Sequence, residues 1–378
     1  MSDYHPEDAS QEQRGYKGRS FKPTPAPAPP KRSRHARNQL VIFLNFCLSA
    51  ALFLMLAVGA VLYWGHYQFN APGPLQQEAT YVVPRSTGVQ AIASGLEREG
   101  IISNAEVFEY GVRLAGTAGE LQAGEFAFAP GTSMRQVMEK LRSGDSIMHS
   151  ITIPEGWTVH RAYERIAASP VLTGDMPDMV PEGTLRPDTY LVQRGTPRKE
   201  VVRQMRAAQE KLVAEIWEGR DEDLPLQDVG QFLTLASIVE RETGIGGERP
   251  HVASVFINRL RQGMRLDSDP TFLYGVYGGE GKPSGQPVTQ SDKDSETPYN
   301  TYKIKGLPPG PIANPGRAAL EAVAHPLETD DLFFVADGTG GHVFSKTLRE
   351  HNNNVAKYRE IERQRRAEAE AAGEGDSE

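Results

Sequence analysis

Two glutamates at the end of an apolar segment are the residues of this chain whose type and position could do acid–base chemistry. Residues 233–244 read LTLASIVERETG, with Glu240 and Glu242 where the apolar run ends. A carboxyl group among apolar neighbours is partly withdrawn from water, which disfavours its charged form and suits it to proton donation near neutral pH. Glu240 directly follows Ile238 and Val239, whereas Glu242 adjoins Thr-Gly. The alternative is an ordinary packed helix that ends in two solvated acids.

Helical spacing does not choose between the two glutamates. A helix is predicted over residues 229–243, with Asp228 as its N-cap, Gln231 in capping-box position and Gly244 as its stop. Its buried face is marked by four apolar residues: Phe232, Leu235, Ala236 and Val239. Each glutamate falls on a flank of that face, roughly 80° from its centre, on opposite sides. Either one could therefore act as an acid, or neither.

Three downstream segments have the composition of a sugar-binding surface. They are RLDSDPTFLYG, TPYNTYKIKGLPPGPIANPG and FFVADGTGGHVF, and all are dense in Asp, Asn, Tyr, Thr, Gly or Pro. Aromatic rings can stack on the apolar faces of sugars, and amides can bind hydroxyl and N-acetyl groups. The third segment also predicts a β-hairpin across a Gly-rich turn. An ordinary irregular surface has the same composition and remains the alternative.

Composition and motifs argue against several other classes of function. The chain has no phosphate-binding loop, no GxSxG elbow and no HExxH pair, and its nine histidines are scattered. We therefore expect no metal site and no cofactor. Residues 1–38 carry a net charge of +4; because the whole chain carries −8, the remainder carries −12. An acidic body argues against nucleic acid as a partner.

Residues 40–64 predict a transmembrane helix, because they form an uncharged apolar run of 25 residues that closes on Tyr63 and Trp64. A spanning helix needs about 20 such residues. The alternative, a cleaved signal peptide, has a shorter apolar core of ~7–15 residues. The basic flank lies before the run, so the positive-inside rule places the N-terminus in the cytoplasm. The single cysteine, Cys47, lies within this run, which leaves no disulfide for the remainder.

A pattern of strand, proline, turn and amphipathic helix recurs three times after the apolar run. The repeats begin near Pro84, Pro130 and Pro154, and each places apolar residues at i, i+3 and i+7, which is one helical face. Those positions are Val89, Ile92, Leu96; Met134, Val137, Leu141; and Val159, Ala162, Ile166. Further helices are predicted over residues 198–217 and 251–263. The sequence therefore predicts an α+β fold.

Several long segments together resemble the signature segments of the YceG-like family, the MltG-type endolytic murein transglycosylases. They are RPDTY, LASIVERET, VASVFINRLRQGMRLDSDPTFLYG, YNTYKIKGLPPGPIANPG and FFVADGTGGHVFS. The similarity covers residues 80–360 in one order. It implies the following organisation: a disordered basic cytoplasmic tail (1–38), a transmembrane helix (39–65), a linker (66–79), a LysM-like βα module (80–150), a mixed α/β catalytic domain with a loop-rich cleft (151–360) and a charged disordered tail (361–378).

The resemblance implies a lyase that cleaves MurNAc–GlcNAc bonds in peptidoglycan, leaves 1,6-anhydro-MurNAc ends and terminates nascent glycan strands. It assigns the catalytic glutamate to Glu240 and leaves Glu242 structural. It places the chain in a bacterial inner membrane with a periplasmic C-terminal domain, acting on glycan strands beside cell-wall synthases. From the matched segments and their polarity we expect five residues to hold the sugar: Asn258, Asp269, Tyr299, Asn300 and Tyr302. The alternatives are a non-catalytic, membrane-anchored wall-binding protein and a hydrolase.

Overall fold

The computed structural model describes residues 38–374, so all but the last residue of the basic tail expected over residues 1–38 lies outside them. The first element, α1 (Gln39–Asn70), is one helix long and apolar enough to cross a membrane, with a mean hydropathy of 2.5 and none of its apolar window buried in the protein. It continues past the predicted end of the span to Asn70, so residues 66–70 are helical instead of linker. The described residues divide into two units, 38–65 and 66–374.

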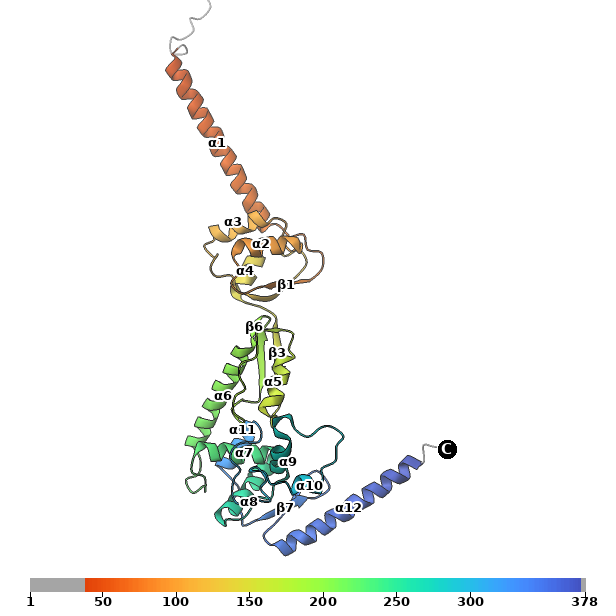
Figure 1. Ribbon diagram of the computed structural model, residues 1–378. Helices are drawn as coiled ribbons and strands as arrows, with labels where there is room; N and C mark the ends of the chain where they lie inside the picture. The colour runs from red at the N-terminus through yellow and green to blue at the C-terminus, as the bar shows by residue number, and fades with distance from the viewer. Residues whose placement is uncertain (1–37, 375–378) are drawn as a thin grey trace, which may run out of the picture. The chain divides into compact units, whose positions relative to one another are not determined.

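The first part of the second unit is a small α+β module (Figure 1). Two strands pair antiparallel over their full length, and three helices cover them. Its core includes Phe108, Phe126 and Phe128, all fully buried. The order is β1 (Ala79–Val83), α2 (Val89–Arg98), α3 (Ala105–Leu114), β2 (Gly124–Phe128) and α4 (Met134–Ser143).

The threefold repeat of strand, turn and helix is confirmed. Its third copy is β3 (Met148–Thr152) with α5 (Val159–Ala167). Eight of the nine periodic apolar positions are buried, and the ninth, Val89, is half-buried. Local capping agrees with the pattern: the Ser133 hydroxyl accepts the N–H of Gln136 in a capping box.

Two short two-stranded sheets and a long helix follow. Strand β3 pairs antiparallel with β5 (Thr189–Gln193), and β4 (Leu172–Thr173) pairs in parallel with β6 (Thr196–Pro197). Helix α6 (Arg198–Glu218) begins directly after β6 and supplies apolar residues to two cores.

The remaining elements form a mainly helical body in which α7, α8 and α11 contact one another (Figure 1). They are α7 (Val229–Glu242), α8 (Arg249–Arg261), α9 (Asp269–Tyr277), α10 (Gln290–Lys293) and α11 (Arg317–Ala324), with short 3₁₀ turns at Gly246–Glu248 and Gly278–Glu280. The predicted hairpin is confirmed as β7 (Phe333–Ala336) paired with β8 (His342–Ser345). Helix α12 (Leu348–Glu374) ends the described chain.

Three features differ from the sequence-based expectation. The RLDSDPTFLYG segment is not all loop, because residues from Asp269 onward form α9, with a proline in its first turn. Helix α11 follows the Pro-Gly pair at 315–316 and was not predicted. Residues 361–374, expected as a charged tail in which a frayed helix runs into disorder, continue α12 as a helix.

Candidate active site

Glu240 lies in the last turn of α7, and the packing of that helix explains why this carboxyl is buried. All four residues of the predicted apolar face are fully buried. The opposite side is buried as well, because α6, α8, α9 and α11 all contact α7. Ser237 is therefore fully buried too, and Glu240 is only 9% exposed. The alternative of two solvated acids at a helix end is wrong for Glu240.

The N-terminus of α7 is capped as predicted, with one difference. The Asp228 carboxylate accepts the N–H of Gln231 at 2.8 Å. The Gln231 side-chain oxygen accepts the N–H of Gln227 at 3.0 Å, one residue before the position that a capping box requires. The helix ends at Glu242, since Thr243 is already extended.

Two donors hold the Glu240 carboxylate. The Arg249 Nη2 atom, at the start of α8, donates to Oε1 at 3.1 Å. The main-chain N–H of Gly316, the N-cap of α11, donates to Oε2 at 2.9 Å. The N–H groups at the start of a helix lack partners within the helix and favour a negative group there. Glu240 thus has a fixed orientation at the junction of α7, α8 and α11.

A second carboxylate lies near the same nitrogen of Arg249. Glu155 belongs to the turn between β3 and α5, and its Oε2 atom is 3.8 Å from Arg249 Nη2. The next residue, Gly156, has a positive φ of 74°, and a Cβ atom there would lie 3.6 Å from Cγ of Glu240. The tight turn therefore lies directly beside the acid.

Glu242 faces different neighbours. The Ser268 hydroxyl, just before α9, donates to its Oε1 atom. Burial raises the pKa of Glu242 to about 7, against the hydrogen bond from Ser268. The Ser268 main-chain N–H donates to Thr301 at 2.9 Å. The loop of residues 299–302 is therefore linked to Glu242 through Ser268.

Two of the expected sugar-binding residues are brought together. The Tyr302 hydroxyl donates to the Asp269 carboxylate at 2.6 Å, and Lys293 lies 3.6 Å from the same carboxylate. The Lys293 ammonium also lies 4.0 Å from the centre of the Tyr302 ring. Burial and the neighbouring Asp269 raise the pKa of Tyr302. These groups form one polar cluster on the α9 side of α7.

The amide groups of Asn258 and Asn300 are engaged with the main chain. The Asn258 Nδ2 atom donates to the carbonyls of Thr329 and Asp331 at 2.8 and 3.1 Å. Asn300 is fully buried, and its Nδ2 atom donates to Lys293 and Ser295 at 2.9 and 2.7 Å. In this structure both side chains hold loops in place.

Tyr299 belongs to a third group, which the sequence did not reveal. Its ring lies 4.9 Å from that of Tyr274, whose hydroxyl donates to Glu182 at 3.3 Å. Glu182 also accepts the N–H of Val159 at 2.7 Å, and burial raises its pKa. No sequence pattern singles out Glu182, Arg249 or Glu155 as functional residues. Their proximity is visible only in the folded structure.

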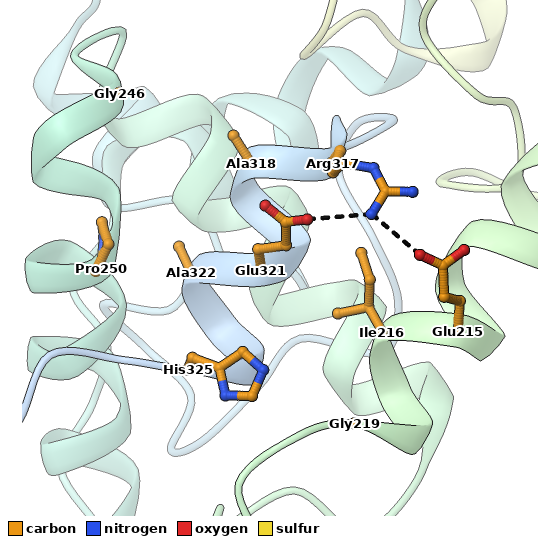
Figure 2. A pocket seen from close by; sticks show the side chains of 10 residues that line it. All are labelled: Glu215, Ile216, Gly219, Gly246, Pro250, Arg317, Ala318, Glu321, Ala322 and His325. Carbon is orange, nitrogen blue, oxygen red and sulfur yellow. Dashed lines mark hydrogen bonds and ion pairs between the residues drawn. The ribbon is translucent and has the colours of Figure 1, made fainter.

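A surface pocket of about 510 Å³ lies near this region but does not contain Glu240 (Figure 2). Arg317 crosses it, donating to Glu215 at 3.2 Å and to Glu321 at 3.1 Å. Its acidic groups are paired in this way, and its wall offers neither an acid free to donate a proton nor a row of aromatic rings. The carboxylates beside Arg249 are the better candidate site.

Comparison with known proteins connects the region around Glu240 to a family. Residues 81–357 match the YceG-like family. The endolytic murein transglycosylase of Bacillus subtilis (strain 168) is 33% identical over 308 residues, which cover 73% of this chain and 83% of that protein. The endolytic murein transglycosylase of Streptococcus pneumoniae serotype 2 (strain D39 / NCTC 7466) is 27% identical over 366 residues, covering 83% of this chain and 65% of that protein. A crystal structure of a YceG-like protein from Listeria monocytogenes is 30% identical, with a TM-score of 0.46, over 73% of this chain and 98% of that one.

Proposed function

The chain belongs to the YceG-like family, and from that membership we propose that it is a lytic transglycosylase that cleaves peptidoglycan within its glycan strands. The observation that carries the proposal is its identity of 33% with a protein named endolytic murein transglycosylase, of which it covers 83%. The matched region includes Glu240, a buried carboxylate with a fixed orientation. We assign to Glu240 the role of the catalytic acid and base.

One carboxyl group is sufficient for the reaction. Glycosidases that use water generally place two carboxyl groups across the bond. Here, Glu240 in its protonated form donates its proton to the oxygen between MurNAc and GlcNAc, and the bond from that oxygen to C1 of MurNAc breaks. The C6 hydroxyl of the same MurNAc attacks C1, and the Glu240 carboxylate takes its proton. The nucleophile is part of the substrate, so it is already close to C1. The products are a free GlcNAc hydroxyl and a 1,6-anhydro-MurNAc end, with no water consumed.

The polar groups around α9 support a binding surface for the glycan strand. Asp269, Tyr302 and Tyr299 are our candidates for contacts with sugar hydroxyls and ring faces. Asn300 supports the loop that carries the two tyrosines, and Asn258 holds the segment of residues 329–331. For the small module of residues 79–143 we propose a LysM-like role in holding peptidoglycan. We further propose that α1 anchors the chain in an inner membrane, with the catalytic body in the periplasm beside cell-wall synthases.

The decisive experiment compares the wild-type chain with Glu240→Gln on purified peptidoglycan. The full chain in detergent should release muropeptides with 1,6-anhydro ends, identified by mass spectrometry. Loss of proton transfer from a positioned acid lowers the rate by about 10²–10⁴-fold, so Glu240→Gln should release almost none. Glu164→Gln on α5, whose side chain is 67% exposed, is the matched control and should match wild type.

Two outcomes would overturn the assignment in different ways. Reducing ends, which are heavier than anhydro ends by one water, would show a hydrolase. Binding to peptidoglycan without release of any muropeptide would show a non-catalytic wall-binding protein. If Glu240→Gln were as active as wild type, another residue would be the acid.

A further inference from the structure

We propose that Glu155 is a positioning residue for Glu240: the two carboxylates compete for the guanidinium of Arg249, so Glu155 sets how firmly that guanidinium is held beside Glu240. The inference rests on the proposed function and adds a second carboxylate to a site that otherwise has one. Glu155 does not touch the reacting atoms in this scheme. It acts through Arg249.

The exposure of the three side chains to solvent increases from Glu240 through Arg249 to Glu155. Arg249 Nη2 lies 3.1 Å from Glu240 Oε1 and 3.8 Å from Glu155 Oε2, so the same nitrogen faces both carboxylates. The side chain of Glu240 is 4% exposed, that of Arg249 is 12% exposed and that of Glu155 is 46% exposed. Glu155 is therefore the member of the series that can exchange a proton with water.

The guanidinium of Arg249 is not held by a full set of partners. Its Nε atom is buried, with no hydrogen-bond partner among the described residues 38–374. A guanidinium offers five N–H donors in a rigid fork, and a well-fixed one uses most of them. Here the one hydrogen bond to a carboxylate, from Nη2 to Glu240, is the main restraint on rotation. A small turn of the side chain would exchange the Glu240 contact for a contact with Glu155.

Main-chain hydrogen bonds hold Glu155 close to Glu240. The Gly156 N–H donates to the Asn314 carbonyl at 3.0 Å, and the Asn314 N–H donates to the Trp157 carbonyl at 2.9 Å. These reciprocal bonds join the turn that carries Glu155 to the loop that ends at Gly316. A Cβ atom at Gly316 would lie 1.8 Å from Glu155 Oε1, while the Gly316 N–H donates to Glu240. The lack of a side chain at Gly316 thus leaves room for the Glu155 carboxylate, while the Gly316 N–H holds Glu240.

The surroundings of the pair disfavour the charged form of Glu155. Burial, followed by the negative charge of Glu240, raises the pKa of Glu155, while Arg249 opposes them and Asp188 adds to them. Two carboxylates near one cation hold a proton more readily than one carboxylate alone. From α7 itself, Arg241 points to the Gly156 carbonyl at 3.4 Å. From α11, Arg317 is paired with Glu215 and Glu321.

This arrangement couples the position of Arg249 to each half of the reaction. While Glu240 carries its proton, Arg249 pairs with the charged Glu155. Once the proton has moved to the glycosidic oxygen, Arg249 returns to the newly charged Glu240. When Glu240 takes the proton from the C6 hydroxyl, the guanidinium swings back to Glu155. Arg249 therefore has a charged carboxylate beside it at each stage of the cycle.

The test is the pH profile of anhydro-muropeptide release by the full chain in detergent. In Glu155→Gln, Arg249 has one carboxylate left to pair with, so it stays with Glu240 through the cycle and opposes the neutral form that donates to the glycosidic oxygen. We expect the alkaline limb of the profile to shift to lower pH by roughly one unit, which is the size expected for the loss of one nearby charge. The rate at the acidic plateau should stay within about threefold of wild type, whereas the rate at pH 8 should fall about tenfold, in line with that shift.

Gly316→Ala is a second variant that removes the same contact without removing a charge. Its φ of −81° suits alanine, so the new Cβ should act mainly by displacing the Glu155 carboxylate. We expect the alkaline limb to shift in the same direction, and the double variant to shift no further than Glu155→Gln. Glu164→Gln should keep the wild-type profile.

A Glu155→Gln profile that superimposes on wild type, or that is lowered equally at every pH, would overturn the inference and leave the proposed function intact. A wild-type chain that releases no anhydro ends would instead overturn the proposed function, and the inference with it.

Discussion

At the scale of single residues, Glu240 and Glu242 lie in the same turn of α7 but have different neighbours. Side chains two positions apart leave a helix roughly 200° from each other. Glu240 consequently meets Arg249 and Gly316, while Glu242 meets Ser268. The partners of Glu240 lie 9 and 76 positions away along the chain. Helical periodicity could place both glutamates at the margin of the core, but it could not supply these partners, because they come from other segments of the fold.

Glu242 should make stability depend on pH in a definite direction. Its pKa is raised by burial from 4.5 to about 7. A carboxyl with a raised pKa in the folded state contributes stability below the unfolded pKa, and that contribution is lost as the pH rises through the folded pKa. Glu242→Gln keeps an acceptor for Ser268 without the charge. We expect the variant to be more stable than wild type by roughly 1–3 kcal/mol at pH 8, and nearly equal to it at pH 5.

Denaturant unfolding at both pH values, followed by the fluorescence of Trp217 in the same core, measures this difference. A stability difference of equal size at pH 5 and pH 8 would show that the buried charge of Glu242 is not the cause.

At the scale of elements, secondary structure was predicted best where the apolar pattern recurs and worst where short helices interrupt loops. The three copies of strand, turn and helix were predicted because apolar residues recur at helical spacing after each proline, and those residues fill the cores. Helix α9 was missed because Asp, Pro and Tyr give its sequence the composition of a loop. Helix α11 has only eight residues, too few for a clear pattern, and yet its N-cap holds Glu240.

The N-cap of α7 offers a test of how far this helix controls the site. Asp228→Ala removes the acceptor for the Gln231 N–H, and the loss of such a cap typically costs about 1 kcal/mol of stability. Glu240 lies at the other end of the helix, where it is held by α8 and α11. We therefore expect a lower melting temperature in Asp228→Ala with an unchanged rate at temperatures well below it.

Asp228→Asn is the matched control, because asparagine caps a helix about as well as aspartate. It should keep the wild-type melting temperature. A lower rate in Asp228→Ala at low temperature would mean that the cap also sets the geometry of Glu240.

At the scale of the whole molecule, the chain combines an apolar helix with an acidic body and a basic N-terminal segment. Helix α1 has the length and hydropathy of a membrane span. The first 38 residues carry +4 and the remainder carries −12. Basic residues favour the cytoplasmic side of a membrane. Sequence alone is informative at this scale because length and charge, unlike the contacts of Glu240, do not depend on how distant segments meet.

The expected orientation can be measured with single cysteines, because the chain has only Cys47 to replace. In a Cys47→Ala background, Ser284→Cys lies in an exposed loop of the catalytic body, and Ser20→Cys lies in the basic N-terminal segment. If the body is outside the cytoplasm, a membrane-impermeant maleimide should label Ser284→Cys in spheroplasts with intact inner membranes. It should label Ser20→Cys only after detergent is added, which is the control for reactivity.

Labelling of Ser20→Cys alone in intact spheroplasts would reverse the orientation and remove Glu240 from the compartment that holds peptidoglycan. Labelling of Ser284→Cys alone would place the acid beside its substrate, as the proposed reaction requires.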